Sequence, residues 1–541
     1  MAASLRMLAS RSLKTVVDNT LAKKDTPKIL SSSADLRLLY QVYHRQGLLS
    51  ELVDILDNPI IGIKSEVGKN DVEFVTVKMN ALEALKRWKE LRQFCLDGLE
   101  ALCKHYESAG KITQEVPNEL AWAVAWQPWK TALNATLEEP SAGSADEFLK
   151  LAQRYLDVDP HHRNSGNALL LHHYLFAKPQ LLTSCKTFFE AHSSKVSCFD
   201  DLKQVAEGLE GEEREQFCDF LSKTSNVTES KDNKVKIRQV TARINAMKLR
   251  YLLHFSDMAA RTDTEIATFI AQCLEVYQTM ADSEDRSSDD ACILAIAALM
   301  KFGSVRSNIY NLQAACLSHL LRDNSQHNFQ ASLLELLNTR VLGLGSMAFG
   351  AYRDLHPQEV QHDTLGHLLY TRFSTLHPWP VNVREVKALD DRFKDPKANI
   401  LHALQYHRRG TDAVLNLLTK DMEKVYFDKA YEFIRFHEQV AQSYSIVQYR
   451  LELQRMRRLT DDSKATTEIP RSFELTFSDN RDSGAIVNFE PASATRSFYE
   501  IATGSFKPCV SAQNALTWTS LTSNRHTGSC GGRSMRQSKC Y

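Results

Sequence analysis

The chain has 541 residues, with 66 Lys plus Arg against 66 Asp plus Glu, so its formal net charge is zero. Zero net charge argues against a general nucleic-acid coat protein, because neutralising phosphates requires a surplus of Lys and Arg. The 20 Gly and 14 Pro are about half of typical usage. Such sparse turn residues argue against sandwiches, propellers and barrels and favour helices with short connections.

Three features bear on the compartment. The longest apolar run, from Ala291 to Met300, is far shorter than the roughly 20 apolar residues that span a bilayer, so we expect no membrane-spanning helix. The eleven cysteines are scattered singly, which indicates reduced thiols in a cytosolic or nuclear compartment. The segment from Met1 to Lys24 is rich in basic residues and Ser, so it is either a mitochondrial presequence or the first amphipathic helix.

Apolar residues recur at helical spacing along most of the chain. The expected helical segments are, in chain order, 34–57, 70–107, 145–157, 165–192, 199–222, 232–255, 263–283, 288–301, 306–321, 327–355, 362–373 and 382–459. After about Leu459 the periodicity fades and Ser, Thr, Asn and Gly increase. We therefore expect a helical domain over 1–460 and an irregular tail over 461–541 that is largely disordered at its end.

Three stretches match the helix–turn–helix unit of tetratricopeptide repeats. They are residues 34–59, with Gly47 at the turn, residues 81–99, with Trp88 at the turn, and residues 333–357, with Gly343 at the turn. The positions expected inside the helix pairs are Leu39, Tyr43, Leu52, Leu56, Leu82, Leu91, Cys95, Leu336, Ala348 and Tyr352. Three such units in one chain predict an all-α fold, an α-solenoid of tetratricopeptide-like helix pairs wound into a right-handed superhelix.

An aromatic stripe precedes the first long polar break. Trp122, Trp126 and Trp129 follow one another at helical spacing, which usually indicates core packing. Because Pro128 interrupts the helix, the alternative is that part of the stripe is an exposed anchor for a partner.

Two histidine doublets, His161–His162 and His172–His173, flank a short polar loop. Four imidazoles could bind zinc or nickel. However, the first doublet follows a turn-forming Asp-Pro, and no Cys, Asp or Glu lies at ligand spacing. We therefore expect helix capping and surface positions for them.

A basic helix is expected over residues 234–250, KVKIRQVTARINAMKLR. Lys236, Arg243 and Arg250 are seven residues apart and share one helical face. This row is either a solvated face or a docking surface for an acidic partner or ribosomal RNA.

Two motifs suggest enzymatic chemistry. RVLGLG, from Arg340 to Gly345, matches the coenzyme A loop of GNAT-fold acetyltransferases. That loop must follow a strand, whereas the residues before Arg340 favour helix. We therefore expect the segment to be the turn of a repeat unit. HDTLGH places His362 and His367 five residues apart, roughly 140° apart on a helix, so we expect no metal site there. No convincing catalytic, cofactor-binding or metal site is predicted.

Over roughly residues 30–500 the chain resembles the non-catalytic auxiliary subunit of N-terminal acetyltransferase B, in its fungal form. The residues of this likeness are KVSCFDDLK (195–203), INAMKLRYLL (244–253), DDACILAIAAL (289–299), the block 328–369 with VQHDTLGHLL, and SDNRDSGAIVNFEP (478–491). Relative to the usual members of that family, the chain is expected to be N-terminally shortened.

The resemblance implies a cytoplasmic, non-enzymatic scaffold. In that family an α-solenoid wraps a small GNAT-fold catalytic subunit as a heterodimer, and the complex acetylates nascent chains beginning Met-Asp, Met-Glu, Met-Asn or Met-Gln at the ribosome. Acetyl-coenzyme A is then expected on the catalytic partner and no cofactor on this chain. The alternatives are an auxiliary subunit of another N-terminal acetyltransferase, an unrelated tetratricopeptide scaffold, or an acetyltransferase that binds coenzyme A through Arg340 to Gly345.

The predicted surface for the catalytic subunit combines a likeness segment with the basic helix. Its residues are Lys195, Phe199, Asp201, Lys203, Lys236, Arg243 and Arg250.

Overall fold

The computed structural model describes residues 14–15, 17, 32–113, 115–140, 143–224, 232–257, 260–280, 286–325, 327–358, 360–380, 395–423, 430–460, 478–482 and 484–491. The chain divides into two compact units. The first unit comprises Met1–Ala295, Val414–Arg435 and Phe489–Ala494; the second comprises Ile296–Ala413, Phe436–Asn488 and Thr495–Tyr541.

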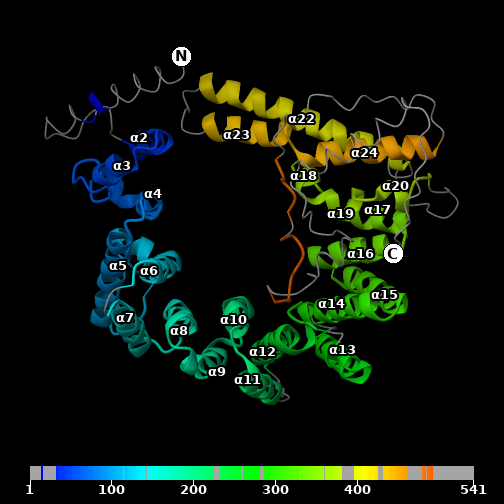
Figure 1. The fold of residues 1–541 in the computed structure, drawn as a ribbon, viewed down its shortest axis with the longest axis horizontal. Helices are drawn as coiled ribbons and strands as arrows, with labels where there is room; N and C mark the ends of the chain where they lie inside the picture. The colour runs from blue at the N-terminus through cyan, green and yellow to red at the C-terminus, as the bar shows by residue number, and fades with distance from the viewer. Residues whose placement is uncertain are drawn as a thin grey trace, which may run out of the picture. The chain divides into compact units, whose positions relative to one another are not determined.

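The first unit is a succession of helices in chain order, which Figure 1 shows from blue α2 to green α13. Their bounds are α2 (Ser33–Arg45), α3 (Leu49–Leu56), α4 (Val72–Ala84), α5 (Trp88–Ala109), η2 (Asn118–Val124), α6 (Gln127–Glu138), α7 (Ser144–Val158), α8 (Arg163–Phe176), α9 (Leu181–His192), α10 (Cys198–Ala206), α11 (Gly211–Thr224), α12 (Asn233–Arg250), the π-helical turn η4 (Tyr251–Phe255) and α13 (Asp263–Gln278). Short 3-10 turns, η1 (Gly68–Asn70) and η3 (Lys178–Gln180), join some of them.

The second unit is also helical. Its helices are α15 (Asn308–Asn324), α16 (Phe329–Val341), α17 (Gly345–Asp354), α18 (Gln361–Leu365), α19 (His367–Tyr370), α20 (Phe373–Leu376) and α24 (Tyr444–Leu459). Three helices have residues in both units, namely α14 (Asp289–Val305), α22 (Pro396–Glu423) and α23 (Ala430–Ala441). The described residues contain no strand, and a single isolated bridge pairs Ser443 with Ser478.

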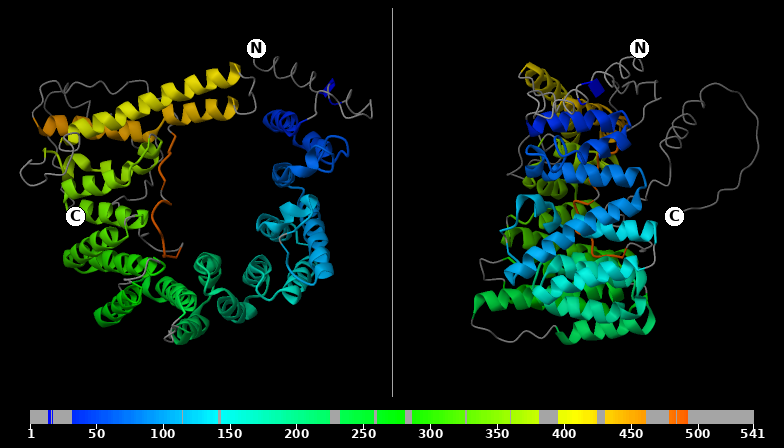
Figure 2. Two further views of the ribbon diagram at one scale, coloured as in Figure 1. Left: turned by 180° about the vertical axis from the view of Figure 1, so that it is seen from behind. Right: turned by 90° about the vertical axis from the view of Figure 1, so that its left-hand side faces the viewer.

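Consecutive helices pack against each other in both units. In the first unit α5 packs on α6, α7 on α8 and α8 on α9, and in the second unit α15 packs on α16 and α16 on α17. Figure 2 shows the blue and cyan helices of the first unit one beneath another in its right-hand view. The predicted class, an all-α solenoid of helix pairs, is therefore confirmed within each unit.

The three predicted repeat units coincide with α2–α3, α4–α5 and α16–α17. Gly47 and Gly343 adopt φ of 74° and 76°, the left-handed conformation in which glycine avoids the steric cost of a Cβ. In the repeat formed by α4 and α5, the left-handed residue of the turn is Lys86, with φ of 56°, two residues before Trp88. All ten predicted inner-face side chains are buried.

Local signals account for where several helices begin. Ser32 and Asp35 form a reciprocal capping box at the start of α2, and Thr262 and Glu265 form another at α13. His162 caps α8, because its ring accepts a hydrogen bond from the backbone N–H of Ser165. The capping role predicted for the first histidine doublet is thus confirmed at His162.

Aromatic side chains fill the first unit's core. Trp129 meets Phe148 and Tyr155 edge-on, with ring centroids 5.6 and 5.0 Å apart. The tryptophan stripe is not one helix, because Trp122 lies in η2 and α6 begins at Gln127 beside Pro128. The core interpretation is confirmed for Trp129, whereas Trp122 is half-buried and stacks on Phe94 at 5.2 Å. The partner-anchor alternative stays a prediction.

Some sequence predictions fall outside the described residues. Most of 1–24, all of 461–477 and all of 492–541 lie there, so the two interpretations of the N-terminus and the predicted disorder at the C-terminal end stay predictions. Within the described part of the chain, no helix is long and apolar enough to cross a membrane, and α14, which contains the longest apolar run, is part of the core.

Candidate partner-binding surface

Helix α10 contains the C-F-x-D-L-K likeness motif. Cys198, Phe199 and Leu202 are buried, so three of its residues face neighbouring helices rather than solvent. Asp201 accepts two hydrogen bonds of 2.7 Å from the guanidinium of Arg163, at the start of α8. Hydrogen bonding to Asp201 is the main reason why the pKa of Arg163 lies above its usual value. Since Arg163 is half exposed, the pair contributes little stability and mainly fixes α10 against α8.

Lys248 of α12 joins the likeness segments of the first unit. Its ammonium donates a 2.6 Å hydrogen bond to Asp290 of α14. The same nitrogen lies 5.9 Å from the ring centroid of Phe199 and 5.3 Å from that of Phe489, within the range of a cation–π interaction. The two rings meet edge-on at 5.7 Å. Four likeness segments that are distant in the chain therefore converge on one buried lysine.

Asn245, one turn before Lys248, fixes the loop that leads into α10. Its side-chain amide donates to the carbonyl oxygens of Ser193 and Lys195, at 2.7 and 2.8 Å. Because Asn245 is buried, these bonds satisfy both donors of its amide where water is excluded. We call Phe199, Asn245, Lys248, Asp290 and Phe489 the α10–α12 clasp.

Glu490 extends the clasp to η4. The hydroxyl of Tyr251 donates to a Glu490 carboxylate oxygen at 3.3 Å. Complete burial raises the pKa of Tyr251 well above its ordinary value, so the hydroxyl keeps its proton and remains a donor. Phe489 and Glu490 are themselves buried, so the last described residues of the chain pack onto helices of the first unit.

The predicted basic row lies on another side of α12. Arg243 forms an ion pair with Glu275 of α13 at 3.5 Å, and the guanidinium of Arg250 lies 3.4 Å from the side-chain oxygen of Gln272. Both arginines are half-buried, and burial lowers the pKa of Arg250. Lys236, near the start of the helix, is also half-buried. The structure therefore places Arg243 and Arg250 of this row toward α13.

The seven predicted partner residues therefore do not form one surface. Phe199 is buried in the clasp, and Asp201 and Lys203 are half-buried beside it, where desolvation lowers the pKa of Lys203. Lys195 is exposed at the α9–α10 turn, next to Val196, whose side chain is 75% exposed. Of the seven, Lys195 is the residue most accessible to another protein, and the role of all seven stays a prediction.

Two other likeness motifs, Q-H-D-T-L-G and S-D-N-R-D-S-G, contact each other in the second unit. Asp363 of the Q-H-D-T-L-G motif accepts hydrogen bonds from the hydroxyl of Ser443 and, at 2.8 Å, from the amide of Asn480 in the S-D-N-R-D-S-G motif. The N–H of Asp482 donates to the carbonyl of Thr364 at 3.0 Å. Both motifs are thus explained by one buried polar network that attaches the segment 478–482 to α18.

The coenzyme A interpretation of Arg340 to Gly345 is wrong. The segment begins in the last turn of helix α16 and is not preceded by a strand, and Gly343 forms the turn into α17. Arg340 is buried and donates a 2.6 Å hydrogen bond to the carbonyl oxygen of Leu368. Its guanidinium therefore joins α16 to α19 instead of facing a phosphate.

The surface position predicted for the second histidine doublet is also wrong. His172 and His173 are buried on α8, where His172 stacks on Phe148 and a ring nitrogen of His173 lies 2.5 Å from the hydroxyl of Ser184. Helical periodicity placed both doublets near a polar loop but did not show that α7 and α9 cover the second one. In the described ranges no group of three or more His, Cys, Asp or Glu side chains is arranged to hold a metal ion.

Sequence reasoning missed the residues at the centre of the clasp. Asn245 and Lys248 lie inside the INAMKLRYLL likeness segment. They do not belong to the basic row of Lys236, Arg243 and Arg250, from which part of the partner surface was predicted. The available signal was that both are polar residues within an apolar stretch, which requires specific partners when buried.

Comparison with known proteins gives a family. The family described as N-acetyltransferase B complex (NatB) non catalytic subunit matches residues 126–484, about two thirds of the chain. The curated relatives include N-alpha-acetyltransferase 25, NatB auxiliary subunit, of Mus musculus, which is 20% identical over 466 residues, and the Homo sapiens protein of the same name, which is 21% identical over 468. Each alignment covers 78% of this chain, but the chain spans only 44% of each relative.

Among solved structures, a chain of the NatB acetyltransferase complex bound to CoA and MES is 13% identical, with a TM-score of 0.48. That match covers 94% of this chain and 64% of the other.

Proposed function

The chain belongs to the family of NatB non-catalytic subunits, and we propose that it is a scaffold for a small GNAT-fold catalytic subunit, with which it forms a heterodimer. In this proposal the complex acetylates nascent chains that begin Met-Asp, Met-Glu, Met-Asn or Met-Gln. Acetyl-coenzyme A binds the catalytic partner, and the complex works at ribosomes in the cytoplasm.

The observation that best supports the proposal is the position of the likeness segments in the structure. In both units they form buried contacts between distant helices, through Lys248 and through Asp363. Residues of this kind preserve an architecture rather than carry out a reaction. The family description, a non-catalytic subunit, agrees with such a role.

The part of the predicted surface best suited to a partner is the α9–α10 turn. Lys195 and Val196 are exposed there, and the buried amide of Asn245 fixes the backbone beneath them. A turn whose backbone is already held in place needs little backbone ordering on binding, which favours association. Arg243 and Arg250 suit a partner less well, because their side chains already pack toward α13.

Co-expression tests the proposal. The full chain is produced with a candidate GNAT-fold catalytic subunit, and size-exclusion chromatography and acetylation of a Met-Asp peptide are measured. We expect an equimolar complex whose activity requires both chains, and no binding of acetyl-coenzyme A by this chain alone. Binding of acetyl-coenzyme A by the isolated chain, or failure to co-purify with any such subunit, contradicts the proposal.

The surface assignment has its own test. Lys195→Glu should weaken assembly about tenfold at low salt and leave a smaller difference at high salt, because exposed charges are screened. Lys150→Glu, an exposed lysine on α7, is the matched control and should assemble normally. If both variants assemble like the unchanged chain, the α9–α10 turn is not part of the interface, whereas the scaffold proposal itself still rests on co-purification.

A further inference from the structure

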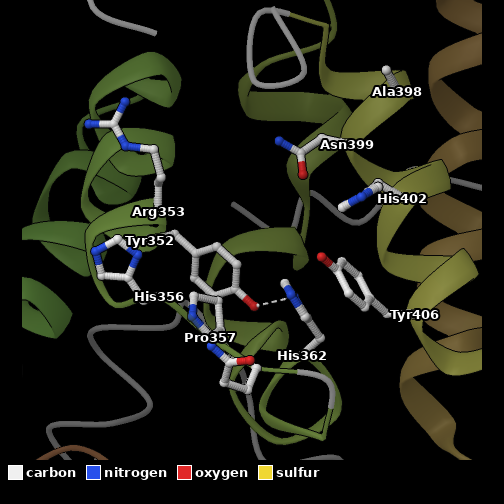
Figure 3. Close-up of a pocket in the computed structure, with 10 residues that line it drawn as sticks. Tyr352, Arg353, His356, Pro357, His362, Ala398, Asn399, His402 and Tyr406 are labelled. Atoms are coloured by element: carbon white, nitrogen blue, oxygen red, sulfur yellow. Dashed lines mark hydrogen bonds between the residues drawn. The ribbon is translucent and has the colours of Figure 1, made fainter. Parts of the chain in front are cut away.

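A cavity of about 320 Å³ opens in the second unit, between α17 with its following loop, α18 and α22. Its lining residues are Tyr352, Arg353, His356, Pro357, Gln358, His362, Ala398, Asn399, His402 and Tyr406. Figure 3 shows Tyr352 and Arg353 on one side of the space and Asn399, His402 and Tyr406 of α22 on the other. Its volume is about ten times the roughly 30 Å³ of one water and reaches the range of small-molecule sites.

Asn399 lines this cavity and has an unpaired hydrogen-bond donor. The residue is 7% exposed, and its side-chain oxygen accepts a 2.8 Å hydrogen bond from the hydroxyl of Tyr370. Burial raises the pKa of Tyr370, so its hydroxyl keeps the proton that it donates to this oxygen. The buried amide nitrogen of Asn399 has no hydrogen-bond acceptor among the residues that the structure describes. Such a donor requires an acceptor from elsewhere.

The lining also contains a neutral histidine, His362 of α18. Burial lowers the pKa of His362 to about 4, and its Nδ1 lies 3.1 Å from the hydroxyl of Tyr352. Burial raises the pKa of Tyr352 well above its ordinary value, so this hydroxyl stays protonated beside the ring. The ring of His362 stacks on Tyr406 at 4.6 Å, and His402 meets Tyr406 edge-on at 4.5 Å.

The charge of the lining is positive. Arg353 carries the permanent charge, and none of the described lining residues is acidic. The guanidinium of Arg353 forms an ion pair with Asp354, 3.0 Å away and outside the lining, so it is held in place while part of its donor set serves Asp354. A cation and an amide on facing walls, with aromatic rings between them, suit a ligand rich in acceptor oxygens.

We propose that this cavity is a binding site for a small organic oxyanion, whose phosphate or carboxylate group accepts hydrogen bonds from Asn399 and is attracted by Arg353. The aromatic rings of Tyr352, His362 and Tyr406 pack against the remainder of the ligand. This site is separate from the surface proposed for the catalytic subunit and does not depend on it.

Isothermal titration of the full chain with inorganic phosphate, and separately with acetate, tests the site. Both titrations are made at pH 7.5 and constant ionic strength maintained with sodium chloride. We expect saturable binding of at least one probe. A response to phosphate alone identifies a phosphorylated ligand, and a response to acetate alone identifies a carboxylate ligand.

Asn399→Asp is the decisive variant. It keeps an acceptor for Tyr370 but replaces the free donors with a negatively charged oxygen, so binding should weaken at least tenfold. Arg353→Gln should weaken binding several-fold, whereas Arg458→Gln, an exposed arginine on α24, should leave it unchanged. Circular dichroism and thermal denaturation show whether each variant folds. If Asn399→Asp does not fold, the binding affinity of Arg353→Gln tests the site instead.

The proposal is overturned if neither probe binds saturably, or if a folded Asn399→Asp chain binds as tightly as the unchanged chain. It is also overturned if Arg458→Gln weakens binding as much as Arg353→Gln, because the attraction would then be a general effect of positive charge.

Discussion

At the scale of single residues, the three repeat units share one turn geometry. In each, a backbone N–H reaches back five residues to close the first helix: Leu48 to Tyr43 at 3.1 Å, Arg87 to Leu82 at 3.0 Å and Leu344 to Thr339 at 2.8 Å. This bond requires a left-handed residue just before the donor. Glycine supplies it twice, at Gly47 and Gly343, and Lys86 supplies it once.

Lys86→Gly should therefore stabilise the first unit by about 1 kcal/mol or less. The left-handed conformation costs a non-glycine residue about 1–2 kcal/mol, and the greater freedom of glycine in the unfolded chain removes part of the gain. Lys86 is exposed, so few side-chain contacts are lost. Urea denaturation measures the change, and Lys86→Ala, which retains the strain, should show little effect. An equal gain in both variants would contradict the backbone explanation.

The converse change, Gly343→Val, should destabilise the second unit by about 1–3 kcal/mol, because a β-branched residue would have to adopt φ of 76°. No described atom lies within 4 Å of the position that the new Cβ would occupy, so backbone strain is the main expected effect. Thermal denaturation checks it, and an unchanged midpoint would show that the turn tolerates other conformations.

Gly98 illustrates a different requirement, close packing inside a helix. A Cβ at this position of α5 would lie 2.2 Å from the ring of Trp122. Gly98→Ala should therefore destabilise the first unit by about 1–3 kcal/mol despite the better helix propensity of alanine. Gly350→Ala in α17 is the matched control, because its Cβ meets nothing within 4 Å and should stabilise by up to about 1 kcal/mol. Combining Gly98→Ala with Trp122→Phe should restore part of the loss.

At the scale of elements, the α10–α12 clasp joins helices through side chains from four chain segments. Phe489 belongs to none of these helices, yet its ring is 4% exposed against Phe199 and Lys248. Burial of such a ring is the larger part of the clasp's stability, because the partner of Lys248, Asp290, is almost half exposed and its ion pair is partly screened.

Phe489→Ala should consequently destabilise the first unit by about 3 kcal/mol, the lower part of the range for buried phenylalanine. Hydrogen exchange should become faster in α10 and α12 and remain unchanged in α5, which does not touch the clasp. Lys248→Met, which keeps the aliphatic packing but removes the charge, should cost less. If Lys248→Met proves the more damaging change, electrostatics rather than ring burial stabilises the clasp.

At the scale of the whole molecule, burial lowers the pKa of histidines in both units, of His172 and His173 in the first and of His362 and His367 in the second. Burial lowers the pKa of His362 and of His367 to about 4, against 6.5 in the unfolded chain. Below pH 6.5 the unfolded chain therefore binds more protons than the folded one. Stability is complete above about pH 6.5 and is lost as the pH falls toward 4, by an amount on the order of 1–3 kcal/mol for each histidine.

Urea denaturation at pH 7.0 and pH 5.0 measures this loss. His367→Gln should reduce the difference between the two pH values, whereas His44→Gln, at an exposed position, should leave it unchanged. Equal stability at both pH values would mean that the imidazoles accept protons without disturbing the packing.

The sequence by itself determined the all-α class, the three repeat units, the turn glycines and the family, because helical periodicity and short motifs are local properties of the chain. It did not reveal Lys86 at the second turn, since lysine, unlike glycine or asparagine, does not indicate a positive φ. Only the tertiary structure decided that His172 and His173 are covered by neighbouring helices, that Arg340 joins α16 to α19, and that Lys248 meets Phe199, Asp290 and Phe489. The side of a helix that becomes buried depends on the helices packed beside it, and distant segments reveal their shared contacts only when the chain is folded.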